Sequence, residues 1–147
     1  MMAKTAEKPR TGSRTRARRL AMQAIYQWLL NDASISDIES QFLDDPESES
    51  ANREYLSELV RGVMQHHLTL SELIAPCLSR TLDEVDPVER AVLLIATYEF
   101  SYVPSVPYKA VINEAVELTK TYGAEQAHKF INGVLDKLAK ELRPKEN

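Results

Sequence analysis

Apolar residues recur every three or four positions along most of this chain, the spacing that places them on one face of an α-helix. No segment alternates apolar and polar residues between turn signals, as a half-buried strand would. The pattern therefore predicts an all-α fold of about seven helices. In chain order they run from Arg14 to Asn31, through Ile38–Leu43, over 52–67, through 68–78, over VERAVLLIATYEF, over PYKAVINEAVELTKTY and through about Leu142.

Capping residues and helix breakers mark several of the predicted ends. Ser13 suits the N-cap of the first helix, and Ser36 with Glu39 forms a capping box for the second. Pro76 predicts a kink or a short break in the fourth helix, because proline removes a backbone donor. Gly123 suits the position that follows the sixth helix, where a left-handed backbone ends many helices.

The fifth helix has the clearest start and the most apolar surface. Asp86-Pro87-Val88-Glu89 combines an N-cap, a proline at the first helical position and a glutamate at the third. The segment that follows, VERAVLLIATYEF, is apolar on most sides, so this helix should be the buried centre of the fold. In contrast, the acidic stretch 44–50 has no apolar period and predicts a solvated linker.

Positive charge is concentrated at the amino terminus. Residues 1–19, the basic arm, hold seven of the 18 Lys and Arg residues but only one of the 22 Asp and Glu residues. A basic arm on an acidic body predicts contact with a polyanion such as RNA or DNA. An idle solvated charge run and attraction to a membrane surface are the alternatives. Residues 1–13 lack an apolar period and predict a disordered tail.

Composition restricts the compartment and the chemistry. At 147 residues the chain suits one domain. Its single cysteine cannot form an internal disulfide, and no apolar stretch suits a membrane span or a secretory signal, so we expect a cytoplasmic protein. The three histidines lack the spacing of a metal site, and the four glycines form no phosphate loop. These absences predict a protein without a cofactor and without catalytic activity.

Three aromatic residues suit either the core or contact with RNA. Tyr26, Tyr122 and Phe130 occur at helical spacing, which is typical of core residues. Tyr122 ends its helix beside a glycine, however, and Lys129 precedes Phe130. Unstacked bases of single-stranded RNA lie on aromatic faces of this kind, flanked by cations. Spacing alone favours the core for Phe130 and leaves Tyr122 open.

Three long stretches resemble the NusB family of bacterial transcription antitermination factors. They are RTRARRLAMQAIYQW, VERAVLLIATYEF and PYKAVINEAVELTKTYGAEQAHKFINGVLDKL, and the likeness extends from Arg14 to about Leu138. The resemblance implies one all-α domain over 14–142, made of two packed helical bundles at about 14–80 and 81–142, with a tail over 143–147. Residues 1–13 extend beyond the matched part.

The resemblance also implies a function without catalysis. Members of the family bind boxA, a short single-stranded RNA element of ribosomal RNA leaders. They do so as a heterodimer with NusE, a small-subunit ribosomal protein. The complex joins NusA, NusG and RNA polymerase and suppresses premature termination.

Carried over residue by residue, the resemblance implies two sets of contacts. The arginine-rich motif falls on Arg14, Arg16, Arg18 and Arg19. The other expected RNA contacts are Tyr26, Lys109, Tyr122, Lys129, Phe130 and Asn132, and the expected NusE contacts are Tyr26, Glu89 and Arg90. Two positions depart from the family pattern: Thr15 interrupts the arginine run, and Gln126 stands where an acidic residue is common.

Three other functions fit parts of the pattern. A NusB-like domain begins certain RNA cytosine methyltransferases, although that interpretation requires a following nucleotide-binding α/β domain. A NusB-like adaptor that binds only protein is a second alternative. A helix-turn-helix protein that binds DNA is a third, but its cations should line an exposed recognition helix and not crowd into one terminus.

Overall fold

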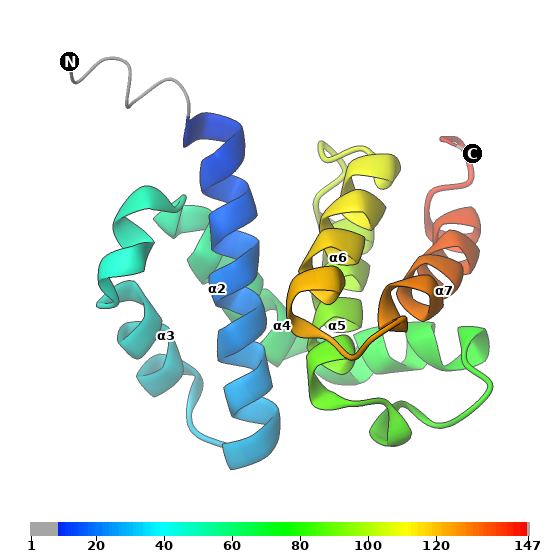
Figure 1. The fold of residues 1–147 in the computed structure, drawn as a ribbon, viewed down its shortest axis with the longest axis horizontal. Coiled ribbons are helices and arrows are strands. Elements are labelled where there is room, and N and C mark those ends of the chain that lie inside the picture. The colour runs from blue at the N-terminus through cyan, green and yellow to red at the C-terminus, as the bar shows by residue number, and fades with distance from the viewer. Residues whose placement is uncertain (1–8, 147) are drawn as a thin grey trace.

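The structure is a computed structural model that describes the backbone of residues 9–146 and the side chains from residue 12 onward. This part of the chain contains helices and no strand (Figure 1). Its α-helices are α2 (Pro9–Asn31), α3 (Ile35–Leu43), α4 (Arg53–Ile74), α5 (Pro87–Tyr102), α6 (Tyr108–Tyr122) and α7 (Ala127–Leu142). Short 3₁₀ helices lie between them: η1 (Pro46–Ser50), η2 (Ala75–Cys77) and η3 (Leu82–Glu84). The predicted all-α fold is confirmed.

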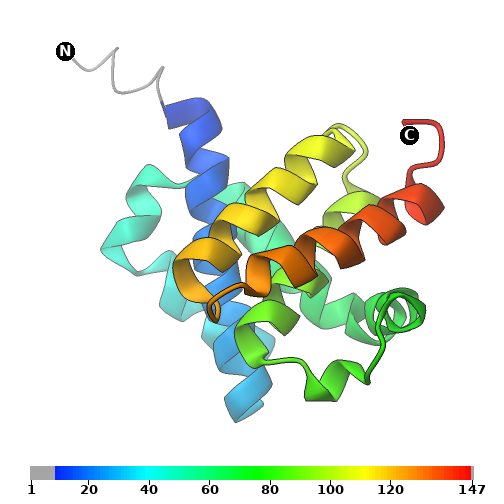
Figure 2. The ribbon, with the colours of Figure 1, turned by 45° about the vertical axis from the view of Figure 1, so that its right-hand side comes forward.

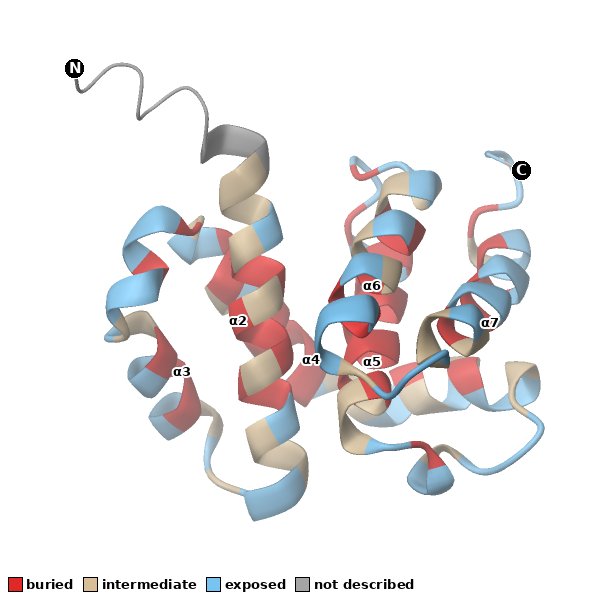
Figure 3. Cartoon of the chain, in the orientation of Figure 1, coloured by how far each residue is buried: buried red, intermediate tan, exposed pale blue. Residues whose placement is uncertain are grey.

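Helix α5 joins two helical bundles. On one side α2, α3 and α4 pack together, and on the other α6 packs with α7, as both views of the ribbon show (Figure 1 and Figure 2). α5 contacts α2, α4, α6 and α7. Every residue from 91 to 100 is buried, and α5 is accordingly red in Figure 3. The predicted buried centre is confirmed, because this segment has no polar side to expose to water.

Helix α2 begins earlier than the sequence predicts. Its first residue is Pro9, and a proline fits the first turn because its missing N–H has no helical partner there. Ser13 therefore lies inside the helix and is not its N-cap. Its carbonyl oxygen accepts a hydrogen bond from the Asn52 N–H at 2.9 Å, which ties α2 to the start of α4. Residues 1–8 of the predicted tail lie outside the described residues.

The capping box predicted for α3 is wrong. The helix is capped by Ser34, whose hydroxyl accepts a backbone N–H of the first turn at 3.1 Å, and not by Ser36. Glu39, the other predicted member of the box, faces α4 instead. There it accepts a hydrogen bond from Ser57 and pairs with Arg61 at 2.7 Å. Glu39 therefore makes a tertiary contact with α4 and not the capping contact that the local sequence predicted.

Helix α4 joins the third and fourth predicted helices into one. It continues to Ile74 because Leu70 and Ile74 extend its buried stripe. Pro76 lies in η2 after the helix has ended, so it stops the helix and does not kink it. Gly62 allows α4 to approach α5: a Cβ at this position would lie 2.2 Å from the ring of Tyr98.

The acidic stretch 44–50 is mostly exposed to solvent, as predicted, but it is ordered and not an irregular linker. Pro46–Ser50 form η1, and Ser48 is fully buried, where its hydroxyl donates to the Leu43 carbonyl at 2.8 Å. η1 packs against α2. The fold therefore places acidic residues beside the basic arm.

Candidate nucleic-acid interface

The four arginines of the arginine-rich motif have different surroundings, because successive residues of a helix point about 100° apart. Arg14, Arg16 and Arg19 are half-buried, whereas Arg18 is only 5% exposed. The motif is therefore divided between the surface of α2 and the interior of the fold.

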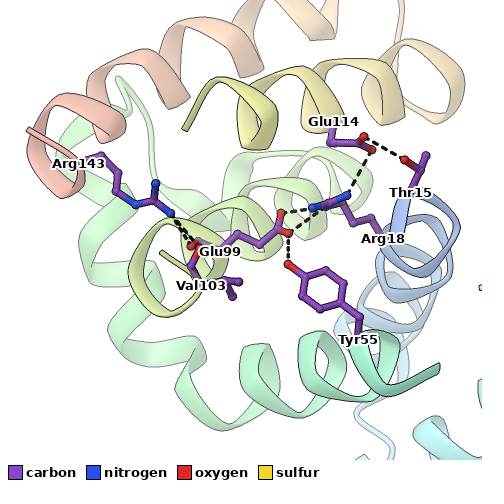
Figure 4. Close-up of polar contacts among 7 residues, drawn as sticks. All are labelled: Thr15, Arg18, Tyr55, Glu99, Val103, Glu114 and Arg143. Atoms are coloured by element: carbon purple, nitrogen blue, oxygen red, sulfur yellow. Dashed lines mark hydrogen bonds and ion pairs between the residues drawn. The ribbon is translucent and has the colours of Figure 1, made fainter. Parts of the chain in front are cut away.

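Arg18 forms an ion pair with Glu99 at the centre of the fold. Its Nε donates to the two Glu99 oxygens at 2.9 and 3.2 Å, and the Tyr55 hydroxyl donates to the same carboxylate (Figure 4). Glu114 adds a longer ion pair to the Nη1 of Arg18 at 3.7 Å. We call Arg18, Glu99 and Tyr55 the buried ion-pair cluster.

Burial and charge act against each other in this cluster. Burial raises the pKa of Glu99, and Arg18 offsets part of the rise. Burial likewise opposes the charge of Arg18, but Glu99, Tyr55 and Glu114 outweigh it, so the pKa of Arg18 is raised above its ordinary value. The guanidinium of Arg18 is therefore largely buried and engaged in an ion pair, and the RNA contact expected at Arg18 stays a prediction.

The other three arginines of the motif are less buried than Arg18, and the partners of Arg16 and Arg19 are exposed, whereas the partner of Arg14 is the buried Tyr55. Arg14 lies over the ring of Tyr55, 4.1 Å from its centroid. Arg16 donates to a backbone carbonyl of η1 at 3.3 Å, and Arg19 pairs with Glu47 at 2.7 Å. Exposed pairs of this kind contribute little free energy. A phosphate group can therefore replace the partners of Arg16 and Arg19 at small cost.

A groove between α2 and α6 brings two of these arginines to Tyr122. This α2–α6 groove has a volume of about 220 Å³. It is lined by Thr15, Arg16 and Arg19 of α2 and by Glu114, Glu117, Leu118, Thr121 and Tyr122 of α6. Tyr122 is 40% exposed, so it is not a core residue, and its contact with RNA stays a prediction. The groove thus combines guanidinium groups with an accessible aromatic ring.

A larger hollow adjoins the groove at Glu114, which lines both. Its volume is about 620 Å³. It lies between α2 and the loop that leads into α6, and its lining residues are Arg14, Arg18, Asn52, Ser105, Val106, Pro107, Ala110 and Glu114. Together the two hollows follow the contact between α2 and α6.

Three other predicted RNA contacts do not line the groove. Lys109 is exposed near the start of α6, and the rise of an α-helix places it about 20 Å from the end of α6 that carries Tyr122. Lys129 and Asn132 are exposed on α7, where the Asn132 amide donates to Asp136 at 3.3 Å.

The cation that lies over the ring of Phe130 is Arg80 and not the neighbouring Lys129. The ring is partly buried and packs against the core. The guanidinium of Arg80 lies 4.9 Å from its centroid, whereas the sequence pointed to the adjacent Lys129. Arg80 follows η2 and is far from α7 in sequence, so no local sequence pattern predicts this contact.

Glu89 is not on the surface as its predicted NusE contact requires. It is 4% exposed, and its Oε2 accepts a hydrogen bond from the Ala124 N–H at 3.0 Å. A Cβ on Gly123 would lie 2.6 Å from that oxygen. Gly123 has a φ of −90°, so it provides room for Glu89 and not the left-handed turn that was predicted. In the loop between α6 and α7, the positive φ of 70° belongs to Gln126.

The other two predicted partner contacts are accessible. Tyr26 is 37% exposed on α2. Arg90 pairs with Asp83 at 3.3 Å and lines a hollow of about 310 Å³ together with Trp28 of α2. Trp28 and Asp83 were not predicted from the sequence as partner contacts.

The described residues contain neither a metal-binding cluster nor a helix that could span a membrane. Among residues 9–146, no three His, Cys, Asp or Glu side chains gather as a metal would require. None of the helices described combines the length and the hydropathy of a membrane span.

Comparison with known protein families matches residues 15–140 to the NusB family. The transcription antitermination protein NusB of Burkholderia vietnamiensis is 49% identical over 134 residues, which are 91% of this chain and 92% of that protein. The protein of the same description from Shewanella halifaxensis is 52% identical over 130 residues, which are 88% of this chain and 96% of that protein.

The fold is also similar to solved structures of NusB. T. maritima NusB superposes with a TM-score of 0.80 at 33% identity, over 90% of this chain and 94% of that one. A crystal structure of the antitermination factors NusB and NusE in complex with dsRNA gives a TM-score of 0.76 at 27% identity, over 88% of this chain and 97% of that one.

Proposed function

The chain belongs to the NusB family, and from this premise we propose that it is a transcription antitermination factor that binds boxA RNA together with NusE. In this role the heterodimer joins NusA, NusG and RNA polymerase and helps the polymerase to resist termination. Relatives about half identical to this chain are transcription antitermination proteins. A similar solved structure holds NusB and NusE in complex with dsRNA.

The α2–α6 groove is the observation that carries the RNA-binding part of this proposal. Arg16 and Arg19 on one wall neutralise phosphates, and the release of condensed counterions drives binding. Tyr122 offers a ring on which an unstacked base can lie. Arg14, beside the adjoining hollow, extends the positive edge of α2. Phosphate contacts position a strand, whereas base contacts select its sequence.

The partner surface of the proposal includes Tyr26 and Arg90 but not Glu89. Tyr26 and Trp28 belong to the carboxy-terminal half of α2, and Arg90 to the first turns of α5. The hollow between these helices combines apolar walls with the Arg90–Asp83 pair. Aromatic and arginine side chains of this kind are enriched where proteins bind one another.

Titration of the full chain with boxA RNA and with a scrambled control, with and without NusE and at several salt concentrations, tests the proposal. If Arg14, Arg16 and Arg19 each neutralise one phosphate, the slope of log K against log salt is about −2 for a single strand. Replacing these three arginines by alanine should flatten the slope, and NusE should increase the preference for boxA. No salt-dependent RNA binding under any of these conditions would overturn the proposal in favour of a protein-only adaptor.

A further inference from the structure

We propose that Glu114 is a specificity-determining residue that accepts a hydrogen bond from the amino group of an RNA base in the α2–α6 groove. The inference rests on the proposed function, because it concerns how a bound strand is oriented and read. It assigns different tasks to the two walls of the groove: α2 holds the phosphates, and α6 reads the bases.

The two walls carry opposite charges. The α2 wall presents Arg16 and Arg19, whereas the α6 wall presents Glu114 and Glu117. A phosphate is attracted to the first wall and repelled by the second. A single strand in this groove therefore lies with its backbone along α2 and its bases toward α6. Tyr122 stands on the α6 wall, where a stacking ring has to be if the bases face that way.

Glu114 occupies the middle of this arrangement, because it lines both the groove and the adjoining hollow. Its side chain is 25% exposed. One oxygen accepts a hydrogen bond from the Thr15 hydroxyl at 3.0 Å, and the other lies 3.7 Å from the Nη1 of Arg18, beyond hydrogen-bond distance (Figure 4). An ionised carboxylate has about four lone-pair sites. Glu114 therefore retains acceptor capacity toward a ligand.

The chemistry of the bases decides which of them can use this acceptor. Cytosine N4, adenine N6 and guanine N2 are amino groups that donate hydrogen bonds, and a carboxylate is a suitable acceptor for them. Uracil presents its O4 acceptor where cytosine has the N4 amino group, so it would place one acceptor against another. Cytosine and uracil have the same ring size and similar area for stacking on Tyr122. A preference for cytosine over uracil that disappears in Glu114→Gln therefore reports the contact to Glu114.

A purely structural role for Glu114 leads to a different result. If its carboxylate only supports Arg18 and Thr15, neutralising it changes the affinity for every strand by the same factor. The ratio of the affinities for cytosine and uracil then stays constant. That ratio separates the two roles, and the absolute affinity does not.

The experiment measures the affinity of the full chain for short single-stranded oligomers of cytidine and of uridine, at one salt concentration. A charge-assisted hydrogen bond should make the cytidine oligomer bind about tenfold more tightly to the wild type. Glu114→Gln should bring this ratio close to one, mainly by improving the binding of uridine. Glu141→Gln, which removes the same charge from α7 outside the groove, should leave the ratio unchanged.

A change in the ligand keeps the test decisive if Glu114→Gln disturbs folding. An oligomer of N4,N4-dimethylcytidine has lost the amino hydrogens, so the wild type should bind it no better than the uridine oligomer. Salt-dependent binding with equal affinity for cytidine and uridine would overturn the assignment of Glu114 alone. If neither oligomer binds at any salt concentration, the proposed function fails and the assignment fails with it.

Discussion

Arg18 and Arg19 are neighbours in sequence and belong to the same basic motif, yet the fold uses them in opposite ways. Arg18 is buried against Glu99 and Tyr55. Arg19 lines the α2–α6 groove, and its partner Glu47 is largely exposed. A shift of one position along the helix therefore separates a buried, ion-paired arginine from an arginine that a ligand can reach.

The difference lies in what happens when the partner is lost. A buried charge that loses its partner has neither water nor a counter-charge, so breaking such a pair is costly. An exposed arginine exchanges a carboxylate for water or for a phosphate with little change in free energy. The buried ion-pair cluster should therefore control stability, and the groove should control binding.

The largest expected effect belongs to the buried ion-pair cluster. Arg18→Ala leaves Glu99 unpaired inside the protein, and we expect it to lower the free energy of unfolding by about 3–5 kcal/mol. Arg19→Ala is the matched control and should change it by less than about 0.5 kcal/mol. Urea unfolding of both variants measures the two values.

Replacing both members of the pair sharpens this test. A variant with Arg18→Met and Glu99→Leu has no charge left to desolvate, so it should recover most of the stability that Arg18→Ala loses. If the double variant is no more stable than Arg18→Ala, packing and not the ion pair explains the loss.

Glu89 tests the same distinction at the α6–α7 loop. Glu89→Ala removes the buried carboxylate that accepts the Ala124 N–H, and the loss of a hydrogen bond to a charged group should lower the free energy of unfolding by about 1–3 kcal/mol. The folded variant should keep its affinity for NusE. Asp83→Asn, which alters an exposed partner of Arg90, is the control and should change stability little. A folded Glu89→Ala protein with weakened NusE binding would return Glu89 to the partner surface.

Much of the fold could be predicted from local patterns in the sequence. Asp86-Pro87 predicted the start of α5, and α5 is the buried centre that its apolar surface indicated. The charge of Arg18 suggested an accessible side chain, whereas its position along α2 indicates the burial that the structure shows. Arg18 lies three and seven residues before the buried residues Ala21 and Ile25, on the same face of α2. A glutamate inside the apolar segment of α5, Glu99, was the signal that a buried cation was required.

The candidate site was less predictable, because its contacts join residues that are distant in sequence. Thr15 and Glu114 are 99 positions apart, and Arg19 and Glu47 are 28 apart. Helical periodicity describes one element at a time and contains no information on which helices meet. The exposed Tyr122 could be suggested from its place at a helix end, but the acidic wall beside it could not.

Tyr122 gives the next expected effect, and it concerns binding alone. Tyr122→Ala should weaken binding of single-stranded RNA by about 1–3 kcal/mol if a base stacks on its ring. Because the side chain is 40% exposed, the melting temperature should change little. Tyr102→Ala is a matched control, since Tyr102 is 44% exposed at the end of α5 and does not line the groove. Equal losses of RNA affinity in the two variants would remove Tyr122 from the site.

The smallest expected effect comes from Glu47, which competes with RNA for Arg19. An incoming phosphate has to replace the Glu47 carboxylate, which lies 2.7 Å from Nη2 of Arg19. Glu47→Gln should therefore strengthen RNA binding, by less than about fivefold because exposed pairs are weak. Glu49→Gln removes the same charge from the same 3₁₀ turn, and among the described residues Glu49 makes no ion pair, so it measures the general effect of charge. In a protein that already carries Arg19→Ala, the Glu47 and Glu49 changes should become equal. If Glu47→Gln still strengthens RNA binding more than Glu49→Gln does in the Arg19→Ala protein, the Glu47 carboxylate acts on the RNA directly. Competition with Arg19 is then excluded.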